Sequence, residues 1–107
     1  MIQAIVSKDS HNNYKSFSCK GHADYDQSGK DIICSAVSMM TINTINSIEQ
    51  FTDCKFKGEM SNGNLFWEFI EEPDDKTVLL MDSLVLGLNQ LQEENSNYIK
   101  LVIKEVP

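Results

Sequence analysis

The chain has 107 residues, a formal net charge of -7, and hydrophobic and charged fractions of 41% and 23%. This length and balance predict one folded domain over residues 1–107 and exclude a disordered chain. The acidic charge repels phosphate backbones, so a nucleic acid partner is excluded. No apolar stretch approaches the roughly 20 residues of a membrane helix. Three cysteines, without a basic and apolar leader, predict a cytoplasmic protein.

The first half of the chain predicts a β-hairpin followed by a helix. Residues 2–7 and 14–19 are rich in strand formers, and "KDSHNN" between them supplies turn residues. Over residues 31–51, apolar side chains recur at steps of three and four, which is typical of one buried helical face. Asp31 stands at the position of an N-cap, so we expect the helix to begin there.

The second half repeats this arrangement and adds a strand. Residues 54–60 and 65–70 predict a second hairpin around Asn62-Gly63, followed by a helix over about 75–92 and a strand over 98–106. The order ββαββαβ predicts an α+β fold in which two helices pack on a mostly antiparallel mixed sheet.

The second helix has a wide apolar surface, because Leu79, Leu80 and Leu86 broaden its core-facing stripe. Two interpretations stay open for these leucines. The helix is either deeply buried, or it carries a homodimer contact.

Cys34 is a candidate nucleophile. With Asp31 as N-cap, Cys34 is the third helical residue, where unpaired amides and the helix dipole favour a thiolate. A thiolate is the reactive form of cysteine. The amides of Cys34 and Ser35 are also candidate donors to the oxyanion that forms when a thiolate attacks a carbonyl. The alternative is a buried structural cysteine, which is commoner.

A thiol protease also needs a group that protonates the leaving amine. His11 lies in a polar turn, whereas His22 follows a strand and a glycine, which makes His22 the better base. Residues 24–30 are polar and contain Gly29, so they form either a gate over the site or an ordinary connector. Asp31 either only caps the helix or also orients His22.

A zinc site is the main rival interpretation. Cys19 and His22 have a ligand-like spacing, and Cys34 and Cys54 can complete four ligands. The paired short spacings typical of zinc sites are missing. Cys19 and Cys54 both fall within strand patterns, which favours small core residues instead.

The stretch "GHADYDQSGKDIICSAVS" resembles the signature of the ribosomal-processing cysteine proteases. That signature has glycine-histidine-alanine, a short loop with a glycine, aspartate, two aliphatics, cysteine, and a serine four positions on. The resemblance extends in pattern over nearly the whole chain. It implies Cys34 as the nucleophile and His22 as the general base. The positions that match the signature in supporting roles are Gly21, Gly29, Asp31 and Ser38.

Members of this family remove a short N-terminal extension from large-subunit ribosomal protein twenty-seven, after a phenylalanine, in Firmicutes and related bacteria. The resemblance therefore implies a basic ribosomal protein as substrate, a homodimer, a flexible loop over the site, and no cofactor or metal. Ser35 stands where alanine is common, and Met39-Met40 replace smaller or aliphatic residues. An acidic enzyme suits a basic substrate. The non-enzymatic alternative is an acidic dimeric module that binds a basic protein.

Overall fold

The computed structural model describes residues 1–21, 28–61 and 63–107. Within these ranges the chain forms five strands and two helices in the predicted order ββαββαβ. The elements are β1 (Ile2–Lys8), β2 (Tyr14–Lys20), α1 (Ser28–Phe51), β3 (Phe56–Ser61), β4 (Asn64–Phe69), α2 (Asp75–Glu94) and β5 (Ile99–Glu105).

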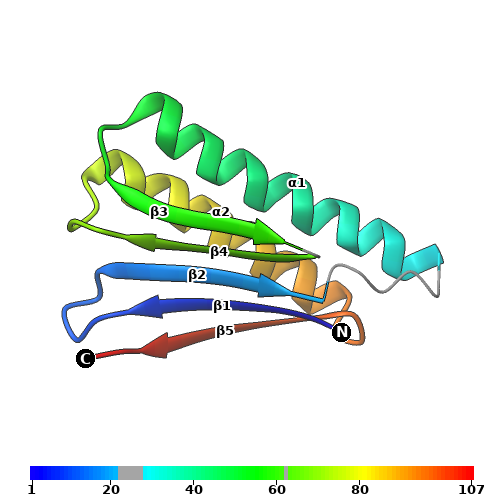
Figure 1. Cartoon of the computed structure of the whole chain (residues 1–107). Helices are drawn as coiled ribbons and strands as arrows, with labels where there is room; N and C mark the ends of the chain where they lie inside the picture. The colour runs from blue at the N-terminus through cyan, green and yellow to red at the C-terminus, as the bar shows by residue number, and fades with distance from the viewer. Residues whose placement is uncertain (22–27, 62) are drawn as a thin grey trace.

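The strands form one sheet in the order β3-β4-β2-β1-β5. Among the described strands, β1 and β5 pair in parallel, and the other three neighbouring pairs are antiparallel. Figure 1 shows both helices on the same side of this sheet, with α1 and α2 next to each other. The predicted α+β fold with a mostly antiparallel mixed sheet is therefore confirmed.

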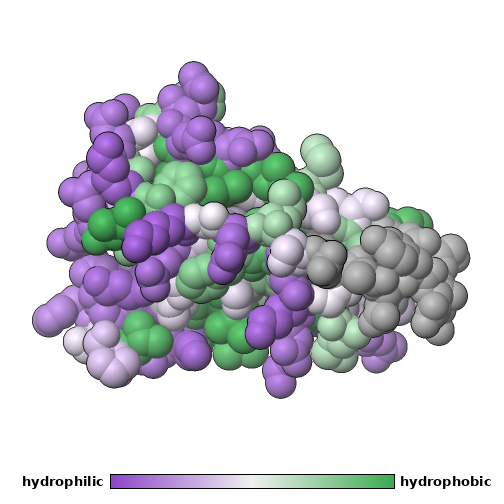
Figure 2. Space-filling view, in the orientation of Figure 1, coloured by the Kyte–Doolittle hydropathy of each residue, from purple (hydrophilic) through white to green (hydrophobic). Residues whose placement is uncertain are grey.

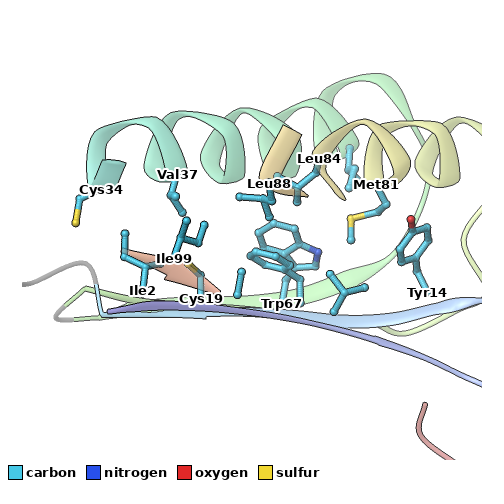
Figure 3. Close-up of a cluster of buried hydrophobic side chains, with 14 of the residues drawn as sticks. Ile2, Tyr14, Cys19, Cys34, Val37, Trp67, Met81, Leu84, Leu88 and Ile99 are labelled. Carbon is cyan, nitrogen blue, oxygen red and sulfur yellow. The ribbon is translucent and has the colours of Figure 1, made fainter. Parts of the chain in front are cut away.

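The core lies between the helices and the sheet. Alternate residues of β1 face the helices, because successive side chains of a strand point to opposite faces. The buried side chains Ile2, Ala4 and Val6 follow this rule. Phe17 and Trp67 stack with their ring centroids 4.6 Å apart. The buried side chains Met81, Leu84 and Leu88 of α2 lie on the helix side of Trp67 (Figure 3). Figure 2 shows hydrophobic side chains also reaching the surface in the middle of the face drawn in Figure 1.

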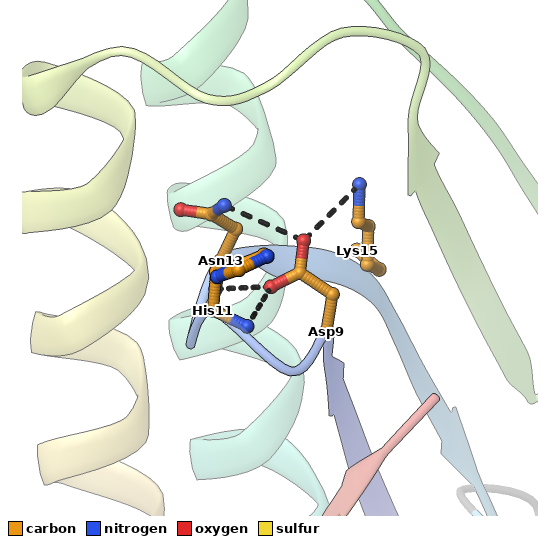
Figure 4. A network of polar contacts seen from close by, with 4 residues as sticks. All are labelled: Asp9, His11, Asn13 and Lys15. Atoms are coloured by element: carbon orange, nitrogen blue, oxygen red, sulfur yellow. Dashed lines mark hydrogen bonds and ion pairs between the residues drawn. The ribbon is translucent and has the colours of Figure 1, made fainter. Parts of the chain in front are cut away.

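The β1–β2 turn is organised by Asp9. Its carboxylate accepts hydrogen bonds from the backbone N–H groups of His11 and Asn13, both at 2.9 Å, and lies 3.6 Å from the Lys15 ammonium (Figure 4). These bonds lower the pKa of Asp9, the bond from Asn13 most. His11 is an exposed turn residue, as predicted.

The prediction that α1 begins at an Asp31 cap was wrong, because the helix begins at Ser28. Ser28 and Asp31 have the Ser-x-x-Asp spacing that is typical of a helix start, and this places Asp31 within the first turn. Residues 28–30, expected in the loop, are helical. Cys34 consequently lies in the second turn of α1 rather than in the first.

The start of α2 agrees with the prediction. Asp74 is its N-cap, and the carboxylate accepts a 2.8 Å hydrogen bond from the Thr77 N–H. The three leucines of α2 behave differently from one another. Leu79 and Leu86 are exposed, whereas Leu80 is half-buried against the core. No helix in the described ranges is long and apolar enough to cross a membrane.

Candidate active site

Cys34 lies at one end of the buried cluster. It projects from α1 on the side of the sheet, and only 6% of its surface is exposed (Figure 3). Its neighbour Ile33 is equally buried, and Val37 continues the same buried stripe along the helix. The core therefore holds the thiol in place.

The Cys19 thiol is a close electrostatic neighbour of Cys34. Burial, and after it the charge of the neighbouring Cys34, together raise the pKa of Cys19 to about 12. Cys19 is itself fully buried in β2, which confirms its prediction as a core residue. A thiol with so high a pKa is not a nucleophile at neutral pH. The interaction of Cys19 with Cys34 shows that the C-terminal end of β2 lies next to Cys34. The sequence pattern of the strand did not predict this proximity.

Gly21 follows β2 and directly precedes His22. Its φ is +98°, in the region that favours glycine. A Cβ at this position would stand 2.5 Å from the Met1 carbonyl oxygen, so no side chain fits between the end of β2 and the N-terminus. A glycine is therefore required before His22 for a steric reason. The sequence indicated Gly21 only as a supporting position of the signature.

His22 lies outside the described residues, as do residues 24–27 of the predicted gate. The rest of that predicted loop, residues 28–30, is part of α1 instead, including Gly29. Asp31 likewise lies in the first turn of α1. The gate and the His22–Cys34 pairing stay predictions.

The two serines near Cys34 differ in exposure. Ser35 is exposed, whereas Ser38 is half-buried one turn beyond Cys34. The Ser38 carbonyl accepts a 3.2 Å hydrogen bond from the Thr41 hydroxyl, which donates also to the Val37 carbonyl.

The expected oxyanion donors were wrongly placed. Because α1 begins at Ser28, the amides of Cys34 and Ser35 lie beyond the first four helical residues, whose N–H groups have no partner within a helix. They are engaged in the hydrogen-bond ladder of the helix. The electrostatic effect of the helix N-terminus also falls off after the first turn.

Cys54 lies at the opposite end of α1, which rules out the four-ligand zinc site. At about 1.5 Å per helical residue, Cys34 and Phe51 stand about 25 Å apart. Cys54 precedes β3, rather than lying in it as predicted, and burial raises the pKa of its thiol. The described ranges contain no group of three metal-ligating side chains.

Comparison with known proteins gives a consistent family assignment. The family model described as "Cysteine protease Prp" matches residues 1–100. The ribosomal processing cysteine protease Prp of Bacillus subtilis (strain 168) is 24% identical over 108 residues, covering 94% of this chain and 96% of that protein. The protein of the same name from Staphylococcus aureus (strain Mu50 / ATCC 700699) is 24% identical over 86 residues, covering 78% and 81%.

Solved structures share the fold. The crystal structure of SMU.848 from Streptococcus mutans has a TM-score of 0.89 and 28% identity, covering 99% of this chain and 96% of that one. The ribosomal processing protease Prp from S. aureus, crystallised in complex with a substrate peptide, has a TM-score of 0.91 and 21% identity. This second similarity covers 97% of this chain and all of the other.

Proposed function

Because this chain belongs to the Prp family of cysteine proteases, we propose that it removes the N-terminal extension of large-subunit ribosomal protein twenty-seven. Cys34 is the nucleophile and His22 the general base. The observation that supports this most is the proximity of the Cys19 and Cys34 thiols, which brings the end of β2 next to the nucleophile. His22 follows Cys19 by three residues, so at most about 10 Å of extended chain separates them.

The reaction proceeds in two steps. His22 takes the proton of the Cys34 thiol, and the thiolate attacks the scissile carbonyl to form a C–S bond. The imidazolium then gives its proton to the leaving amine as the C–N bond breaks. A water molecule, deprotonated by His22, attacks the resulting thioester, which releases the acid product and restores the thiol. Since Cys34 lies beyond the first helical turn, a charged His22 is the main stabiliser of its thiolate.

Charge supports a ribosomal protein as the substrate. The chain carries a net charge of -7, and complementary charges speed the encounter with a basic protein. Such an enzyme acts in the cytoplasm, where ribosomal proteins are made. Asp31, in the first turn of α1, is proposed to orient His22.

Cleavage of the precursor tests the function. The ribosomal protein from the same genome, with its extension, is incubated with the protease, and the products are identified by mass. We expect one cut after a phenylalanine, inhibition by thiol alkylation, and no inhibition by chelators. Activity lost in chelator and restored by zinc contradicts the Cys–His mechanism. An unchanged precursor supports the non-catalytic binding module instead.

We also propose that the protein is a homodimer that uses the outer face of α2. Leu79 and Leu86 are 69% and 60% exposed and lie seven residues apart, on one stripe of the helix. Leu80 is half-buried against the core and is excluded from this surface. Sedimentation should show a dimer at micromolar concentration, and Leu79→Glu with Leu86→Glu should give a monomer. A monomeric wild type contradicts the proposal.

A further inference from the structure

The β3 strand has one open edge. In the described ranges, β4 is the strand that pairs with β3, and β3 is at the end of the sheet order. The Ile70 N–H donates to the Lys55 carbonyl at 2.9 Å, which makes these two residues a hydrogen-bonded pair. Such pairs alternate along an antiparallel ladder. With the observed register, Phe56, Gly58 and Met60 therefore direct their backbone N–H and C=O groups away from β4.

Two hollows are lined in part by β3. On the helix side, a hollow of about 230 Å³ lies between β3 and α1 and is lined by Ile45, Met60 and Trp67 among others. On the open face of the sheet, a second hollow of about 510 Å³ is lined by residues of all five strands, from Glu59 of β3 to Lys104 of β5. The residues that line both hollows are Glu59, Leu65 and Phe66.

We propose that the substrate's extension binds as an added strand on the β3 edge and places alternate side chains against the helix-side hollow. Successive side chains of a strand point to opposite faces, so every second side chain of a peptide on this edge faces that hollow. Strand addition gains affinity from main-chain hydrogen bonds and selectivity from pockets for alternate side chains. This inference rests on the proposed function, because the bound segment is the substrate of that reaction.

The position of the edge connects it with Cys34. Ser61, at the end of β3, and Lys20, at the end of β2, line the same hollow. Figure 1 shows these strand ends on the side of the molecule where α1 begins. Ile45 lies in the second half of α1, about 16 Å along the helix from Cys34. About five residues of extended peptide cover that length, so a segment anchored on β3 reaches the nucleophile.

The lining indicates what the bound segment carries. Ile45, Met60 and Trp67 are apolar, and Met60 on this edge strand is 67% exposed. Glu49 and Glu59 also line the helix-side hollow. An extended segment with an apolar side chain and a nearby lysine or arginine fits this surface by contact and by charge. This chemistry agrees with a basic ribosomal protein.

Amide exchange gives the direct test. A synthetic peptide of the N-terminal extension is added to the Cys34→Ala protein, which cannot cut it, and exchange is followed residue by residue. We expect exchange at Gly58 and Met60 to slow by about tenfold or more, because their N–H groups gain partners. Lys57 and Glu59, which already pair with β4, are the internal control and should change little. Unchanged exchange at Gly58 and Met60 with bound peptide overturns strand addition.

Kinetics with two variants of one residue give an independent test. Met60→Pro removes the outward N–H and the side chain, and proline is tolerated on an edge strand. Met60→Ala removes the side chain alone. We expect KM for the precursor to rise about tenfold more in Met60→Pro than in Met60→Ala, with kcat unchanged and similar Tm values. Equal KM values overturn strand addition, whereas failure of the wild type to cut the precursor overturns the proposed function itself.

Discussion

The first turns of the two helices contrast sharply. At α2, the Asp74 carboxylate caps the helix through the Thr77 N–H, and the Thr77 hydroxyl donates to the Thr52 hydroxyl at 3.3 Å. At α1, the helix begins three residues before Asp31, and the buried cysteine follows in the second turn. An aspartate ahead of an apolar run is thus a structural cap in one helix, while the other helix starts without it.

The surroundings of the two turns differ in the same way. Near α2, the Cys54 N–H donates to the Thr52 hydroxyl, and Thr77 is fully buried, so the polar groups are used for stability. Near α1, β2 ends at a glycine with positive φ pressed against the N-terminus, and two thiols lie close together. Backbone constraint and crowded reactive groups are more typical of a functional site than of a plain helix start.

The largest expected difference between the start of α1 and the start of α2 is the effect of removing a thiol on cleavage activity. Cys34→Ala should abolish cleavage of the precursor and leave the fold intact, because it removes the nucleophile and few core atoms. Cys54→Ala, near the start of α2, should keep full activity. The Cys19→Ala protein should also cleave the precursor. Product yield and circular dichroism are the measurements. Equal loss of activity in all three variants contradicts the assignment of Cys34.

Gly21→Ala is expected to have the next largest effect. The new Cβ would meet the Met1 carbonyl oxygen and would need a positive φ, so the end of β2 must shift. We expect kcat/KM to fall by more than about tenfold and Tm to fall as well. Gly58→Ala is the matched control for stability, since a Cβ there meets only ordinary contacts at 3.4 Å or more. Wild-type kcat/KM in Gly21→Ala contradicts a role for this position.

Much of the fold follows from local patterns. The ranges predicted for β1, β2, α2 and β5 lie within two residues of the observed bounds, because period-two alternation and a good acidic cap are local signals. The sheet order could not be predicted in this way. The parallel pairing of β1 with β5 joins the two ends of the chain and depends on tertiary packing.

The site was predicted less completely than the fold. The cap was assigned to Asp31 alone, and the Ser28-x-x-Asp31 spacing before the same apolar run was not used. This moved the predicted position of Cys34 by one turn. Leu80 was grouped with Leu79 and Leu86 because a wide apolar helix surface does not reveal its boundary. The nearness of Cys19 to Cys34 required knowing which face of β2 meets α1.

Two alanine variants separate the roles of the helix aspartates. Asp74→Ala removes the carboxylate that accepts the Thr77 N–H hydrogen bond, so Tm should fall by roughly a few degrees while kcat stays unchanged. Asp31→Ala should show the opposite result, with lower kcat and nearly unchanged Tm, if Asp31 orients His22. The readouts are thermal melting and steady-state kinetics at several pH values. A purely structural Asp31 would give a lower Tm and an unaltered pH profile.

The smallest expected effect is the pH dependence of the α2 cap. Hydrogen bonds from Thr77, its side chain first and its backbone N–H second, hold the pKa of Asp74 below the ordinary value of 3.8. A lowered pKa in the folded state means that the carboxylate stabilises the fold above the unfolded pKa. This stabilisation is lost as the pH falls through the folded pKa.

Asp74→Asn isolates that contribution, because asparagine also caps helices but does not titrate. The wild type should melt slightly above the variant at neutral pH, and the gap should close below pH 3.8. Asp9 in the β1–β2 turn also has a lowered pKa and titrates in the same range. It is present in both proteins, so the difference between their melting curves reports Asp74 alone. A gap that is constant with pH would mean that the charge of Asp74 contributes nothing and that its geometry alone starts α2.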